Sequence, residues 1–131
     1  MNPILENWMR IAENDLKSAR ALEREALFET ACYHCQQAAE KYLKAYLIYA
    51  AIEPPRSHDL TRLVTIAKTV EDKFEKLNEA ATALSDYATL FRYPVDVPVT
   101  CTQEDTKEAI EMAQSVKEFV LERIKPEDTK D

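Results

Sequence analysis

The chain has 131 residues, of which 46% are hydrophobic, 24 are acidic, 17 are basic and none is glycine. This length fits one domain with a contiguous apolar core, and the absence of glycine favours long helices over hairpins and leaves any turn with positive φ to other residues. The net charge of -7 opposes nonspecific contact with a phosphate backbone, so we expect no DNA binding and only local contact with RNA or a nucleotide.

Apolar residues at three- and four-residue steps predict the first two helices. The first spans about residues 4–24, and its buried stripe is Leu5, Trp8, Ala12, Leu16, Ala19 and Leu22. The second runs from about Leu27 to Ala51 and ends before Pro54-Pro55, because proline disfavours a helical residue before it and lacks an amide donor. One side of it is apolar (Phe28, Cys32, Cys35, Ala39, Tyr42, Leu43, Tyr46 and Tyr49), and the other carries Gln37, Lys41, Lys44 and Ile48. We expect this second side to face solvent, a partner chain or an anionic ligand.

Three further helices are predicted. A helix over about 58–69 has Ser57 and Asp59 at its start, and the next opens with Asp72 and Glu75 and repeats with heptad spacing as far as Phe91. Residues 92–101 carry two prolines and indicate an extended connection, after which Thr102 and Asp105 open the last helix. The fold class is therefore all-α, an up-and-down bundle of four to five helices over 1–125 with a frayed tail over 126–131.

Composition also bears on compartment and cofactors. No apolar segment approaches the roughly 20 residues of a membrane span, so we expect no membrane association. Three cysteines and a start without signal-peptide features indicate a reducing cytoplasm. Cys32 and Cys35 have the spacing of a zinc or redox pair, but both fall on the apolar side of a helix and zinc needs two more ligands. We predict no metal and no cofactor.

Three motifs resemble those of one protein family. Gln36-Gln37-Ala38-Ala39-Glu40-Lys41-Tyr42-Leu43-Lys44 is followed by His58-Asp59-Leu60 and, after a long amphipathic helix, by Arg92-Tyr93-Pro94. In order and spacing they resemble the signature of HEPN-domain proteins, over nearly the whole chain. The resemblance implies an HEPN-like bundle that is often a homodimer. It also implies nucleotide binding, RNA cleavage, or a small nucleotidyltransferase partner in a toxin-antitoxin-like pair.

The ribonuclease members of the family carry an arginine followed, after four to six residues, by a histidine, and they cleave RNA without metal. The histidines of this chain are His34 and His58. The residues at the required spacing before them are Leu27, Phe28 and Glu29, and Ala51, Ile52 and Glu53. We therefore predict a noncatalytic protein with no catalytic residues. A metal-independent endoribonuclease remains the alternative, if the fold brings His58 and Arg92 together.

The ligand-binding candidates are Gln37, Lys41, Lys44, His58, Asp59, Arg92 and Tyr93. Lysines and an arginine fork suit phosphate oxygens. The alternative is structural: Lys41 pairs with a nearby acid or lies in solvent, Gln37 links helices, His58 bonds a carboxylate and Asp59 stabilises a helix start. The two-sided second helix would leave an apolar stripe uncovered in a monomer, which predicts a homodimer.

Overall fold

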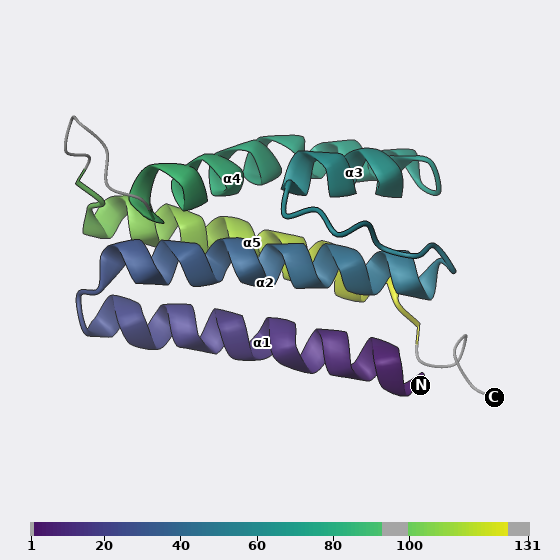
Figure 1. The fold of residues 1–131 in the computed structure, drawn as a ribbon, viewed down its shortest axis with the longest axis horizontal. Helices are drawn as coiled ribbons and strands as arrows, with labels where there is room; N and C mark the ends of the chain where they lie inside the picture. Colours follow the sequence, from purple (N-terminus) through teal and green to yellow (C-terminus); the bar gives the residue numbers. More distant parts are fainter. Residues whose placement is uncertain (1, 93–99, 126–131) are drawn as a thin grey trace.

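Five α-helices and one short 3-10 helix make up the part of the chain that the structure describes (Figure 1). The computed structural model describes residues 2–92 and 100–125, and side chains over 2–87 and 100–125. In chain order the elements are α1 (Pro3–Arg24), α2 (Phe28–Tyr49), α3 (Leu60–Lys68), η1 (Asp72–Leu77), α4 (Asn78–Arg92) and α5 (Gln103–Arg123). The predicted all-α bundle is confirmed. The 92–101 connection falls mainly outside the described residues, and the 126–131 tail falls wholly outside them.

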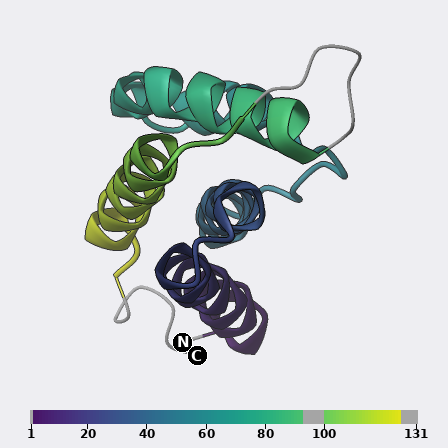
Figure 2. The same ribbon diagram turned by 90° about the vertical axis from the view of Figure 1, so that its left-hand side faces the viewer.

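Helix α2 is the centre of the molecule. It packs against α1, α3, α4 and α5, and Figure 2 shows α1, α5 and the layer of α3 and α4 on three sides of it. No helix of the described chain covers its fourth side, between α1 and the layer of α3 and α4 (Figure 2). Side chains on that side, among them Tyr33, His34, Gln37, Lys41 and Ile48, are only partly buried. Gln37, Lys41 and Ile48 of the predicted polar side lie here, whereas Lys44, which was predicted with them, is buried.

Alanine takes the place of glycine where the first two helices end. Ala26 and Ala51 have φ of 60° and 62°. At the end of α1 the amides of Ala26 and Leu27 donate to the carbonyls of Glu23 and Leu22, and the same pair of bonds recurs after α2. This is the Schellman arrangement, which normally places glycine at the left-handed position. The prediction that non-glycine residues would make such turns is confirmed.

The start of the fourth helix differs from the prediction. Residues Asp72–Leu77 form a 3-10 helix, and α4 begins only at Asn78. A 3-10 helix repeats every three residues, so it places Phe74 and Leu77 on one side, and both are buried. The residue before this turn, Glu71, makes no capping bond and instead accepts from Arg123 Nε at 2.9 Å. The 3-10 turn therefore places both apolar residues in the core.

The predicted N-termini of the other helices and their buried residues agree with the structure to within about two residues, and α3 begins at Leu60 where about residue 58 was predicted. Thr102 and Asp105 form a capping box at the start of α5, and Asp59 is the N-cap of α3. Four members of the first-helix stripe are buried, whereas Trp8 and Leu22 are only partly buried. None of the helices over residues 2–92 and 100–125 is both long enough and apolar enough to cross a membrane.

Candidate functional site

A buried carboxylate organises one polar cluster beside the uncovered side of α2. Glu40 accepts from Lys44 Nζ at 3.1 Å, from Gln36 Nε2 at 3.3 Å and from the His58 ring at 3.0 Å. Gln36 Nε2 also donates to the carbonyl oxygen of His58 at 3.0 Å. We name these four residues, Gln36, Glu40, Lys44 and His58, the Glu40 cluster. It fastens the end of the α2–α3 connection to the middle of α2.

Burial is uneven within the Glu40 cluster. The side chain of Glu40 is 4% exposed and that of Lys44 is 8% exposed, whereas the side chain of His58 is 79% exposed. The ammonium of Lys44 also lies 5.9 Å from the centre of the Trp8 ring on α1. A buried cation between a carboxylate and an indole face is held in one place, because few other positions would satisfy its charge.

A second buried carboxylate organises a cluster between α1 and α2. Asp15 accepts from the His34 ring at 2.9 Å and from Lys41 Nζ at 2.5 Å. Asp15 is buried, and His34 and Lys41 are partly exposed. We name these three residues the Asp15 cluster. The two lysines expected to act together thus belong to separate clusters, since Lys41 turns to α1 and Lys44 to Glu40.

Both histidines of the chain are held in the same way. In each, Nδ1 contacts a buried carboxylate, which is Asp15 for His34 and Glu40 for His58. An ionised carboxylate only accepts hydrogen bonds, so Nδ1 carries the proton and Nε2 is the nitrogen open to a ligand. A neutral ring then offers Nε2 as an acceptor for N–H or O–H groups. It can donate to a phosphate only after it gains a second proton.

The charges of both clusters are largely compensated. Glu40 pairs with Lys44, and Asp15 pairs with Lys41. Because each carboxylate already pairs with one lysine, a phosphate arriving here would have to compete with a carboxylate already in contact. Fixed, neutral polar groups suit hydrogen-bonded recognition of a partner better than capture of a highly charged anion.

The remaining candidates occupy different positions. Gln37 Nε2 donates to Gln36 Oε1 at 2.8 Å, which joins it to the edge of the Glu40 cluster. Asp59 accepts from the Thr61 amide at 3.0 Å and from the Thr61 hydroxyl at 2.6 Å, and these bonds hold the pKa of Asp59 below its ordinary value. It therefore serves as the N-cap of α3. The side chain of Arg92 and all of Tyr93 lie outside the described residues.

Sequence reasoning missed the two carboxylates on which these clusters depend. Asp15 follows Trp8 and Ala12 and precedes Ala19 at steps of three and four residues, so it stands within the buried stripe of α1. An acidic residue in such a stripe is a signal for a buried partner. Glu40 stands four residues before Lys44 and four after Gln36, which puts all three on one side of the helix.

Apolar residues of α1 border the polar side of α2. Ile4, Trp8, Ile11 and Asp15 follow one another at helical steps, and Asp15 contacts α2, so the four lie along the edge of α1 nearest that side. Ile4 is 62% exposed, and Trp8 and Ile11 are partly buried. We name the uncovered side of α2 together with this edge of α1 the α1–α2 face.

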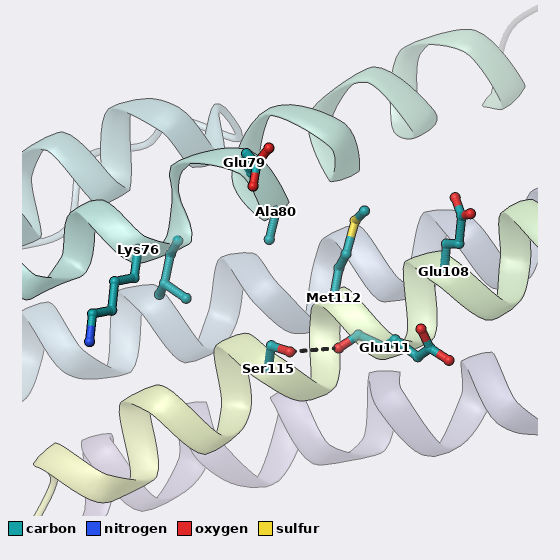
Figure 3. Close-up of a pocket in the computed structure, with 8 residues that line it drawn as sticks. Lys76, Glu79, Ala80, Glu108, Glu111, Met112 and Ser115 are labelled. Carbon is teal, nitrogen blue, oxygen red and sulfur yellow. Dashed lines mark hydrogen bonds between the residues drawn. The ribbon is translucent and has the colours of Figure 1, made fainter.

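A separate hollow lies elsewhere, between η1, α4 and α5 (Figure 3). Its volume is about 350 Å³, and it is lined by Lys76, Leu77, Glu79, Ala80, Glu108, Glu111, Met112 and Ser115. Three carboxylates against one ammonium make it unsuitable for a phosphate. None of the predicted site residues whose side chains the structure describes lines it. Among the residues that the structure describes, three or more His, Cys, Asp or Glu side chains nowhere gather as a metal site.

The fold and the clusters define a class of protein: a helical bundle whose central helix carries a Gln-Gln-x-x-Glu-Lys-x-x-Lys stripe joined to a histidine from the next connection. The model of the HEPN domain family matches residues 5–124, and the chain belongs to that family. It is similar to the crystal structure of ST0689, an archaeal HEPN homologue, with a TM-score of 0.76 and 30% identity over 95% of this chain and 100% of that one. It is also similar to the crystal structure of TT1696 from Thermus thermophilus, with a TM-score of 0.81, 30% identity and the same coverage. No curated protein matches the sequence.

Proposed function

We propose that this HEPN protein is a noncatalytic interaction module that uses the α1–α2 face to bind its partners. One partner is a second copy of the chain, and another is a small nucleotidyltransferase with which it forms a toxin-antitoxin-like pair. The observation that carries the proposal is that buried Asp15 and Glu40 hold the polar groups of this face in fixed positions. A face that only needed to be soluble would not require such ordering.

The border of the face supports protein docking. Protein interfaces combine an apolar area with polar groups that find partners across the contact. Ile4 and Trp8 supply exposed apolar area on α1, and Ile48 supplies more on α2. His34 and His58 each keep an Nε2 that can accept from a partner.

Nucleotide binding is the narrower form of the same proposal. Lys44, Gln37 and His58 lie close enough together to contact one small molecule, because Gln36 and Glu40 link them by hydrogen bonds. A nucleotide offers base amino groups and ribose hydroxyls to Nε2 of His58. Its phosphate reaches Lys44, whose side chain is only 8% exposed, only if the Glu40–Lys44 pair opens. Its binding would be weak at neutral pH, since Glu40 already compensates Lys44.

Light scattering on the purified chain and copurification with a coexpressed nucleotidyltransferase test the proposal. Ile4→Glu adds a charge to the α1–α2 face at a position that is already 62% exposed, so the fold should tolerate it. The matched control is Val70→Glu, at a residue that is 49% exposed and lies after α3. We expect Ile4→Glu to weaken dimers and the complex at least tenfold and Val70→Glu to leave both unchanged. A monomeric wild-type chain that also fails to copurify would reject the proposal.

A ribonuclease is the second candidate, and one observation favours it. The bond from Glu40 to Nδ1 orients His58 with Nε2 free, as a general base requires. In this case the purified chain cleaves RNA in EDTA, and His58→Ala abolishes the cleavage while His34→Ala does not. The noncatalytic proposal predicts intact RNA with all three proteins.

A further inference from the structure

Two of the three cysteines are in contact although they lie 69 positions apart. Cys32 is near the start of α2, and Cys101 directly precedes Thr102, the N-cap of α5. Their sulfur atoms are 3.5 Å apart, and both residues are buried. The hydroxyl of Thr106 lies 3.8 Å from the sulfur of Cys32 and 3.7 Å from that of Cys101. The sequence suggested a pair of Cys32 and Cys35, whereas the cysteines in contact are Cys32 and Cys101.

The two thiols are not equivalent. Burial raises the pKa of Cys32, its hydrogen bond to Cys101 raises it further, and the contact with Thr106 acts in the opposite direction. Burial also raises the pKa of Cys101, but the hydrogen bonds from Cys32 and Thr106 act in the opposite direction. When Cys32 donates its S–H group to Cys101, this bond favours the thiolate of Cys101 over that of Cys32, although burial keeps the pKa of Cys101 above its ordinary value.

We propose that Cys32 and Cys101 form a peroxide-sensitive thiol pair that closes to an intramolecular disulfide. The Cys101 thiolate attacks one oxygen of hydrogen peroxide and becomes a sulfenic acid, and the other oxygen leaves as water. The Cys32 sulfur then attacks the sulfenic sulfur, the S–S bond forms, and the hydroxyl leaves as a second water. In sum, two thiols and one peroxide give one disulfide and two waters. The sulfurs need to approach from 3.5 Å to about 2.05 Å for the bond to form.

Burial sets the rate of this reaction, because peroxide reaches the sulfurs only when the chain around Cys101 opens locally. The disulfide would join the start of α2 to the start of α5 and close a loop of about 70 residues. Such a loop closure constrains the unfolded chain, and we expect Tm to rise by about 10 °C.

Treatment of the full chain with hydrogen peroxide, followed by alkylation under denaturing conditions and peptide mass spectrometry, tests the pair. We expect one alkylated thiol, Cys35, and one cross-linked peptide joining Cys32 to Cys101. The Cys35→Ala variant should form the same cross-link with the same rise in Tm, and dithiothreitol should reverse both. Cys101→Ala and Cys32→Ala, each checked for folding by circular dichroism, should lose the intramolecular cross-link.

Either of two results would overturn the proposal. One is three alkylated thiols after overnight exposure to peroxide, which shows that the contact is inert. The other is a cross-link that involves Cys35 or joins two chains. If Cys101→Ala or Cys32→Ala fails to fold, the Cys35→Ala protein still tests the proposal, because Cys32 and Cys101 are its only cysteines.

Discussion

Replacing Glu40 tests whether the buried Glu40–Lys44 ion pair stabilises the fold. In Glu40→Gln the side chain keeps its size but loses its charge, so the ammonium of Lys44, only 8% exposed, remains without its counter-ion. Loss of one partner of a buried pair costs about 3–5 kcal/mol. His58 contributes little to this loss because its ring is mostly in water.

The reverse change should cost less. In Lys44→Met the carboxylate of Glu40 keeps two donors, Gln36 and His58, so we expect a loss of about 1–2 kcal/mol. The double variant should lose less than the sum of the two single variants, by about 2 kcal/mol, because it leaves no unpaired charge.

Urea denaturation at one fixed protein concentration measures these free energies of unfolding. With an m-value of about 2 kcal/mol/M, Glu40→Gln should lower the midpoint by about 1.5–2.5 M. The matched control is Glu53→Gln, an exposed acid in the α2–α3 connection, which should stay within about 0.5 kcal/mol of wild type. If Glu40→Gln is as stable as this control, Lys44 is not held by a buried pair and the reasoning fails.

Three further predictions concern stability. Burial raises the pKa of Glu13, but hydrogen bonds from Lys117 and Tyr42 together outweigh it and leave the pKa lowered. The pKa of Asp59 is lowered by hydrogen bonds from Thr61. A carboxyl whose pKa is lower in the folded than in the unfolded state stabilises the fold above its unfolded pKa, and this stability is lost as the pH falls through the folded pKa. Urea midpoints should therefore fall from about pH 4.5 downwards, and they should fall less steeply in Glu13→Gln. Ala51→Gly, which relieves a φ of 62°, should raise the free energy of unfolding by about 0.5–1 kcal/mol by urea titration, and a lower value would argue against left-handed strain. Thr102→Ala removes a capping box and should cost about 1 kcal/mol in the same assay, whereas an unchanged midpoint would show that the cap contributes nothing.

The sequence predicted the second helix well because local rules determine it. Apolar steps along one side set its orientation. It ends at Tyr49, two residues before the predicted end at Ala51, and the left-handed turn at Ala51 stops it ahead of the twin prolines. Its polar side was also predicted. The 3-10 turn before α4 was not predicted, since Asp72 and Glu75 resemble the capped start of an α-helix.

The arrangement within the site was less predictable. Lys41 and Lys44 are three positions apart, which separates them by about 60° around the helix, and each turns to the nearest buried carboxylate. For Lys41 that carboxylate is Asp15 on α1, and the register between two helices cannot be derived from spacing along one of them. For Lys44 it is Glu40, which a pair four residues apart already indicated. Whether Gln37, Asp59, Arg92 and Tyr93 touch a ligand stays a prediction.

Fluorescence of Trp8 reports directly on docking at the α1–α2 face, because Trp8 is the sole tryptophan and lies on that face beside Lys44. Titration with the nucleotidyltransferase, or dilution of the chain itself, should shift the Trp8 emission along the same curve that sedimentation gives for complex formation. An unchanged emission while sedimentation records a complex would place the interface elsewhere and contradict the proposal.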